Sequence, residues 1–155
     1  TDVLSRTLDP DDLFVYLNGS LAQRFIADAA QLTERMAGFD LSPDPDGRYR
    51  INECYCFDGT WQLALRALVS RSDVVLMDLR GFRPENLGCR FELGVLAAAG
   101  HLRRVVVLHD RESALEVART DIAAGDASRF VWLPAGRMNN AMAGRVLSAL
   151  FGKAG

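Results

Sequence analysis

The sequence predicts an α/β fold in which five parallel strands alternate with five helices. Three observations lead to this prediction. Short runs rich in β-branched and aromatic residues alternate with segments whose apolar residues recur every three or four positions. The third and fourth of these runs lack polar alternation, which is typical of strands covered by helices on both faces. The chain has 155 residues, the size of one domain, so residues 1–155 are treated as a single domain.

The predicted strands are short apolar runs bounded by turn residues. The first lies between Asp12 and Gly19, and the fifth stops at Pro134, which has no N–H to donate to a sheet. The third is the clearest, because four apolar residues in a row precede Asp78. The strands are expected at Leu13–Asn18, Tyr49–Phe57, Asp73–Leu79, Arg104–His109 and Arg129–Leu133.

Helices are predicted where apolar residues share one helical face. The first stops near Gly38, a residue typical of helix C-caps, and the prolines and glycine of Leu41–Gly47 predict a loop after it. The second begins at Gly59-Thr60, and the third covers Cys89–Ala99. The apolar stripes of the other helices are Leu21, Phe25, Ala29, Leu32 and Met36 in the first, Trp61, Leu65 and Leu68 in the second, Leu115, Ala118 and Ile122 in the fourth, and Met142, Val146, Leu147 and Leu150 in the fifth.

This alternation predicts a doubly wound, three-layer sandwich of flavodoxin-like strand order 2-1-3-4-5, with right-handed helical crossovers. Ligands of such sheets bind beyond the carboxyl ends of the strands, near the switch point between the first and third strands. The start of the third helix falls at that edge. So do two further groups of residues: Asn18, Gly19 and Ser20 after the first strand, and Asp78, Arg80 and Gly81 after the third.

Composition, charge and the length of the apolar runs argue against several classes of function. Lys and Arg number 18 against 20 Asp and Glu, a net charge of −2, which gives nucleic-acid binding no electrostatic support. Three cysteines, an odd number, argue against a disulfide framework and favour a reducing, cytoplasmic setting. The longest apolar stretch, near Leu93–Ala99, is far shorter than the ~18 residues of a membrane span. The first residue is Thr1, which indicates a processed chain or a domain excised from a longer protein.

The residues after the predicted strands exclude several classes of protein that share such folds. The turn after the first strand holds a single glycine, Gly19, where a dinucleotide-binding turn needs a glycine-rich run. No Gly-Lys-Ser/Thr sequence occurs, so there is no P-loop. A phosphate-accepting receiver would use Asp78, but it also needs an acidic pair after the first strand and a lysine after the fifth, and neither is present.

Glu92 is the strongest candidate for chemistry. It lies near the amino end of the third predicted helix, where the helix dipole stabilises a carboxylate by ~0.3–1 kcal/mol. Gly88 allows a tight entry into the helix, and Gly94 leaves room for a ligand beside the carboxylate. Such a carboxylate can bind ribose hydroxyls or stabilise a cationic anomeric carbon during glycosyl transfer. The alternative is a solvated residue paired with Arg90 or Arg103.

The same segment carries a family resemblance. Cys89-x-x-Glu92-Leu93 resembles the Trp-Cys-x-x-Glu-Leu box of Toll/interleukin receptor (TIR) domains, although Gly88 stands where those domains usually carry Trp. Gly88-Cys89-x-Phe91-Glu92-x-Gly94 is similar to the Gly-Thr-x-Phe-Glu-x-Gly motif of nucleoside 2-deoxyribosyltransferases. Asp12–Tyr16 is similar to the first-strand box of TIR domains. The nearest resemblance is to bacterial TIR-like domains.

That resemblance implies cleavage of an N-glycosidic bond of NAD or a related nucleotide, with Glu92 as nucleophile or oxocarbenium stabiliser. NAD would then be the substrate rather than a cofactor, and activity would require a homo-oligomer. Cys89 would line the substrate site. The alternative is a non-catalytic module of the same fold that senses a nucleotide or joins partners in signalling. An unpaired Glu92 in a pocket would favour the enzyme, and a salt-bridged Glu92 the module.

The remaining candidates each have a structural alternative. Arg80 could clamp a phosphate and Asp78 a ribose, or the two could pair with each other. Ser20, with Asn18 and Gly19, could bind a phosphate or simply cap the first helix. His109-Asp110 could line the same edge, or Asp110 could begin the next helix. Cys54 and Cys56 share one face of a strand, but their spacing matches no zinc pattern, which favours free thiols and no metal.

Overall fold

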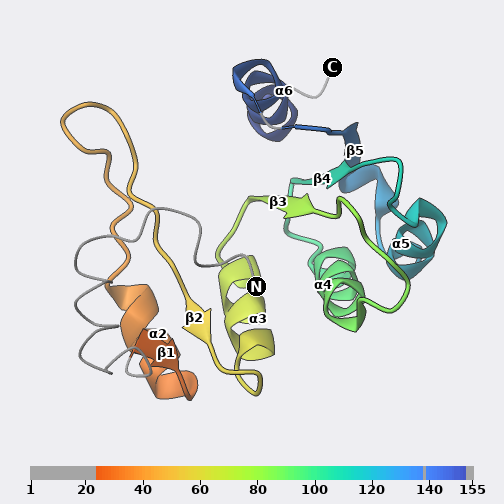
Figure 1. Cartoon of the computed structure of the whole chain (residues 1–155). Coiled ribbons are helices and arrows are strands. Elements are labelled where there is room, and N and C mark those ends of the chain that lie inside the picture. Colours follow the sequence, from red (N-terminus) through yellow and green to blue (C-terminus); the bar gives the residue numbers. More distant parts are fainter. Residues whose placement is uncertain (1–23, 138, 153–155) are drawn as a thin grey trace. The chain divides into compact units, whose positions relative to one another are not determined.

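The structure is a computed structural model that describes residues 24–137 and 139–152. Figure 1 traces its elements along the chain. Two compact units make up the fold, the first ending at Leu65 and the second starting at Arg66. The boundary falls inside helix α3 (Trp61–Ser70). Within the described ranges, every helix is too short or too polar to cross a membrane.

In the first unit, the described residues form a short sheet, a helix and the first turn of α3. Strand β1 (Phe25–Ile26) runs parallel to β2 (Tyr55–Cys56), with Phe25 opposite Tyr55 and Ile26 opposite Cys56. Helix α2 (Ala29–Ala37) lies between them in sequence and buries Leu32 and Met36. Gly38 forms its C-cap, as the sequence predicts.

The segment predicted as a helix from Leu21 onward is partly a strand. Helix α2 starts only at Ala29, because the Asp28 side chain accepts a hydrogen bond from the N–H of Gln31 and so caps it there. Upstream, Ile26 is buried in β1, and its carbonyl accepts a hydrogen bond of 2.6 Å from the Thr60 hydroxyl. The predicted first strand, Leu13–Asn18, lies outside the described residues.

The second predicted strand shrinks to two residues. Tyr49 and Ile51 are 67% and 87% exposed, so the first half of the predicted run has no apolar face to bury. Its polar residues bond instead to the preceding loop: Arg50 contacts Asp44, and the Asn52 amide donates to the carbonyl of Asp40. These loop contacts leave only Tyr55–Cys56 to pair with β1.

The second unit is built on a three-stranded parallel sheet. Strands β3 (Val74–Asp78), β4 (Arg104–His109) and β5 (Phe130–Pro134) lie in the order β3-β4-β5. Helix α4 (Leu87–Ala98) connects the first two, and α5 (Leu115–Ile122) with the short turn η3 (Ala127–Arg129) connects the last two. These elements coincide closely with the predicted ones, because a parallel crossover of this length requires a helix.

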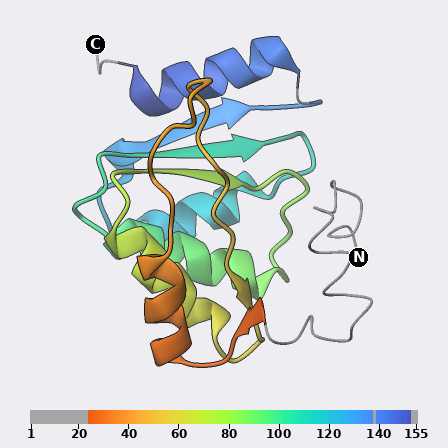
Figure 2. The same cartoon turned by 90° about the vertical axis from the view of Figure 1, so that its left-hand side faces the viewer.

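Side chains of β4 fill the core on both faces of this sheet. Val105, Val106, Val107 and Leu108 are all at most 2% exposed. Val106 and Leu108 pack with Met142 and Val146 of helix α6 (Asn140–Phe151). Figure 2 shows α6 on one face of the sheet and α4 and α5 on the other.

The predicted five-stranded sheet of order 2-1-3-4-5, and with it the flavodoxin-like sandwich, is wrong. The described strands form two parallel sheets of two and three strands. Among them β3 pairs only with β4, and Leu76 in the middle of β3 is 45% exposed, so this strand is not covered as the sequence suggested. The ladder between β1 and β2 consists of two residue pairs, and the predicted first strand lies outside the described residues.

Candidate functional site

Glu92 lies one and a half turns into α4, which begins at Leu87. The helix places Leu93 and Leu96 in the core, at 0% and 2% exposure, and leaves the Glu92 side chain half-buried beside them. The influence of a helix dipole fades beyond the first turn. At this depth the surroundings of the carboxyl group, rather than the dipole, set its ionisation.

Burial raises the pKa of the Glu92 carboxyl above its ordinary value. Among the described residues, no hydrogen bond or ion pair reaches this carboxyl group. Its charge is felt by Cys89, one turn earlier: burial, and then the charge of Glu92, raise the pKa of the Cys89 thiol. Glu92 is therefore a half-buried carboxyl group with no compensating cation among the residues that the structure describes.

Arg90, the residue that could have neutralised Glu92, is engaged elsewhere. Its Nε and Nη2 atoms each donate to the Asp121 carboxylate at 2.8 Å. This bidentate pair joins α4 to α5, and Asp121 is only 14% exposed. The paired alternative for Glu92 through Arg90 is thus not what the structure shows.

Asp78 and Arg80 form a closed ion pair at the end of β3. The Arg80 Nε donates to the two Asp78 oxygens at 2.9 and 3.1 Å, and Nη1 donates to the carbonyl of Gly136 at 2.8 Å. Hydrogen bonds from Arg80 hold the pKa of Asp78 below its ordinary value. Arg80 therefore ties the loop after β3 to the loop after β5, and the structure shows no bond from either residue to Glu92 within the described ranges.

Gly81 connects this edge to the loop after β4. It has a positive φ of 69°, which a side chain would strain, and its N–H donates to the Asp110 carboxylate at 3.1 Å. Asp110 also accepts from the Ser113 hydroxyl at 2.8 Å, and that hydroxyl lies 2.8 Å from the carbonyl of Leu79. These bonds, led by the one from Gly81, lower the pKa of Asp110.

Asn18, Gly19 and Ser20, predicted to complete the site from the first strand, lie outside the described residues. The predicted site is therefore represented here by Asp78, Arg80, Gly81, Cys89 and Glu92. The structure pairs Arg80 with Asp78, bonds the neighbouring Gly81 to Asp110, and places Cys89 and Glu92 on α4.

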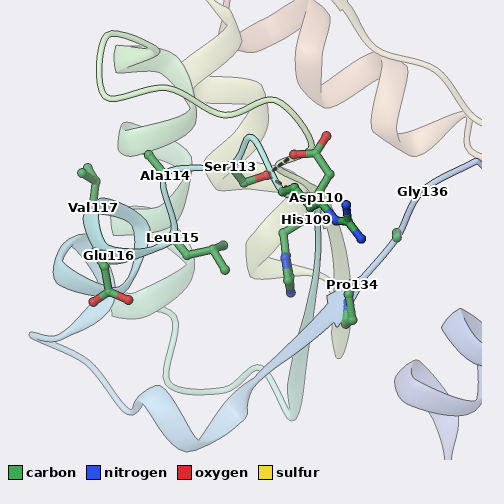
Figure 3. A pocket seen from close by; sticks show the side chains of 11 residues that line it. His109, Asp110, Ser113, Ala114, Leu115, Glu116, Val117, Pro134 and Gly136 are labelled. Carbon is green, nitrogen blue, oxygen red and sulfur yellow. Dashed lines mark hydrogen bonds between the residues drawn. The ribbon is translucent and has the colours of Figure 1, made fainter.

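From the sequence, the loop after β4 is expected only to line the edge of the site through His109 and Asp110, but the structure shows a pocket there. A pocket of about 870 Å³ opens there, between the start of α5 and the residues that follow β5. In Figure 3 the His109 ring points between Leu115 and Pro134, while Asp110 and Ser113 bond to each other at the rim. The signal for the rim was the Asp110-x-x-Ser113 spacing, which lets a carboxylate and a hydroxyl close a turn.

The cysteines do not assemble a metal centre. Cys54, Cys56 and Cys89 are free and half-buried. Burial raises the pKa of both Cys54 and Cys56. Over the described ranges, no three His, Cys, Asp or Glu side chains converge in a way that could hold a metal ion.

Comparisons with protein-family models, with curated proteins and with solved structures found no match to this chain.

Proposed function

We propose that this protein cleaves an N-glycosidic bond of NAD or a related nucleotide, and that Glu92 is the residue on which the reaction depends. The observation that carries the proposal is the unpaired, half-buried Glu92 carboxyl with its raised pKa. Titratable groups with perturbed pKa values cluster at functional sites. The motif resemblance around Cys89 and Glu92 supplies the reaction class.

In this reaction the bond between the anomeric carbon and the base nitrogen breaks, and its electron pair leaves with the base. Positive charge develops on the ribose ring, and an ionised Glu92 would stabilise that charge or bond to the anomeric carbon. Water would then add to the anomeric carbon and lose a proton. Weak solvation strengthens the attraction between the carboxylate and the developing cation.

The alternative is a non-catalytic nucleotide-sensing or interaction module, and one observation favours it. Arg80, the residue expected to bind phosphate, is bonded to Asp78 and to the carbonyl of Gly136. Glu92 would then be a weakly solvated residue on a surface that recognises a partner.

The first experiment measures nicotinamide release from NAD⁺ at high protein concentration, since the resemblance implies a homo-oligomeric enzyme. Glu92→Gln keeps the size of the side chain and removes its charge. We expect the release rate to fall by about 10²–10⁴-fold, the usual contribution of a positioned acid or base. Glu85→Gln, an exposed glutamate just before α4, is the matched control and should leave the rate unchanged.

Circular dichroism spectra of both variants establish that each is folded. Equal nicotinamide release by wild type and Glu92→Gln would contradict the role of Glu92. Absence of release from NAD⁺ by folded wild type at high concentration would favour the non-catalytic alternative.

A further inference from the structure

The pocket at the carboxyl ends of β4 and β5 is separate from Glu92. Its lining comes from the end of β4, the first turn of α5 and residues 134–136, and neither Cys89 nor Glu92 contributes. A volume of about 870 Å³ lies within the range of small-molecule sites. Ligands of parallel α/β sheets bind at this end of the strands.

The walls of the pocket are mainly apolar. Ala114, Leu115 and Val117 come from α5 and the residue before it, and Pro134 faces them from the end of β5 (Figure 3). Among the polar lining residues, Asp110 and Ser113 are occupied with each other and with the backbone of Gly81 and Leu79. Two facing apolar walls are suited to the faces of a flat ring.

His109 supplies hydrogen-bonding capacity that the protein itself does not use. Its Nδ1 atom is buried and has no hydrogen-bond partner among the described residues. The ring points into the space between Leu115 and Pro134 (Figure 3). The Trp132 ring lies next to it, tilted by 58°, with the ring centroids 6.5 Å apart. Because Nδ1 is closed to solvent, a ligand in the pocket would bond to the other ring nitrogen, Nε2, which also has no hydrogen bond to the described residues.

The charges around the pocket argue against an anion. Asp110 and Glu116 both lie in the lining, and the only lining cation among the described residues is the exposed Arg111. Arg119, on the next turn, is paired with Glu116 at 3.0 Å. With Glu116 paired to Arg119, the rim carries no excess of positive charge to attract a phosphate.

We propose that this pocket binds an uncharged planar heteroaromatic molecule, of the nucleobase or nicotinamide class. The ring lies between Leu115 and Pro134 and bonds through a ring nitrogen or amide to the His109 imidazole. This inference goes beyond the proposed function and does not need it, because it concerns binding at residues other than Glu92.

The test is ligand-detected NMR titration of the full chain with adenine and with nicotinamide. Glu92→Gln protein is used alongside wild type, so that loss of catalysis cannot change the result. Leu115→Lys places a charge in one apolar wall and should weaken binding of both rings at least tenfold. Leu147→Lys makes the same exchange at a side chain of α6 that is 57% exposed and lies outside the pocket, and it should bind like wild type.

Two further comparisons examine the chemistry. His109→Phe keeps a flat ring beside Trp132 and removes the hydrogen bond, so we expect binding to weaken about three- to tenfold, the value of one such bond. Adenosine monophosphate should bind no more tightly than adenine. The proposal is overturned if neither ring binds wild type, if Leu115→Lys binds both rings as wild type does, or if the phosphate strengthens binding tenfold.

Discussion

At the scale of single residues, Glu92 and Arg90 show how two neighbouring charges on one helix meet opposite environments. Arg90 bonds twice to Asp121, and those bonds, more than coulombic attraction, lower the pKa of Asp121. Glu92 has burial without such a partner, and its pKa moves upward. A carboxyl group whose ionisation is opposed by its surroundings lowers stability at any pH where it must ionise.

The sign of this effect gives a stability prediction. The folded state binds the Glu92 proton more tightly than the unfolded state, so folding stability falls as the pH rises from the unfolded pKa through the raised folded pKa. Glu92→Gln removes this loss. We expect it to raise the free energy of unfolding at pH 8 by less than about 1 kcal/mol, since the side chain is only half-buried, and to change it little at pH 4.

Urea denaturation of wild type and Glu92→Gln at the two pH values measures that difference. Glu85→Gln is again the control, because it makes the same exchange at an exposed side chain. A Glu92→Gln effect of the same size at both pH values would show that packing, rather than ionisation, causes it.

Glu92 could be singled out from the sequence because its signal is local, and its catalytic role stays a prediction. The glycines, the cysteine and the glutamate of α4 lie within one stretch of chain. Arg80 is different: its bond to Gly136 links residues 56 apart, and no pattern near Arg80 indicates that its guanidinium joins two loops. The phosphate-binding role predicted for it rests on residue type alone.

At the scale of elements, Arg129 holds the end of α4 in place. Its Nη1 donates to the carbonyl of Ala99 at 2.7 Å and its Nη2 to that of Ala97 at 2.9 Å, and both carbonyls lie at the helix end, where intrahelical partners are missing. Gly125 also lies against this end of α4. A side chain cannot replace its hydrogen, since an added Cβ would stand 2.4 Å from the Ala97 carbonyl oxygen. The segment after α5 therefore packs directly on the last turn of α4.

Replacing Arg129 with Leu should destabilise the protein by about 2–4 kcal/mol, because two helix-end carbonyls lose their donor in a site where the side chain is 10% exposed. The change in urea midpoint at pH 7 measures this. Arg103→Leu, at an exposed residue just before β4, should change the free energy of unfolding by no more than about 0.5 kcal/mol. Equal effects of the two variants would mean that Arg129 stabilises by charge rather than by its contacts.

Elements of the second unit could be predicted because pattern and packing agree. Strand β4 begins and ends at the predicted residues, Arg104 and His109, and its buried valines explain why. In the first unit, apolar spacing alone does not predict the elements correctly. Phe25 fits a helical stripe as well as it fits a strand, and only the Asp28 cap and the pairing with Tyr55 decide between them.

At the scale of the whole molecule, sheet order depends on strand pairing that sequence does not encode locally. The order β3-β4-β5 follows from two short helical crossovers. Joining the earlier strands to β3 requires a ladder, and the described residues form only two residue pairs between β1 and β2. The predicted pairing between the first strands and β3 came from the analogy with doubly wound folds. The described strands do not form that pairing.

The carboxylates of the second unit also determine how the whole molecule responds to acid. Hydrogen bonds lower the pKa values of Asp78, Asp110, Asp121 and Asp126, led by Arg80, Gly81, Arg90 and Ser128 respectively. For a lowered pKa, the stabilisation is complete above the unfolded value and is lost as pH falls through the folded value. Stability should therefore decline below about pH 4, the ordinary pKa of aspartate.

Asp121→Asn tests this at the carboxylate that joins α4 to α5. It removes a charge that accepts two bonds from Arg90, so we expect lower stability at pH 7 and a shallower decline between pH 5 and pH 2 in thermal unfolding. Because Glu92 has the opposite shift, its protonation stabilises the fold as the pH falls through its raised pKa, and this partly offsets the loss at the upper end of the range. Among wild type, the two single variants and the double variant, Asp121→Asn alone should therefore show the smallest acid-induced decline and Glu92→Gln alone the largest, because Glu92→Gln removes the offset. An Asp121→Asn variant as acid-sensitive as wild type would place the response in other carboxylates.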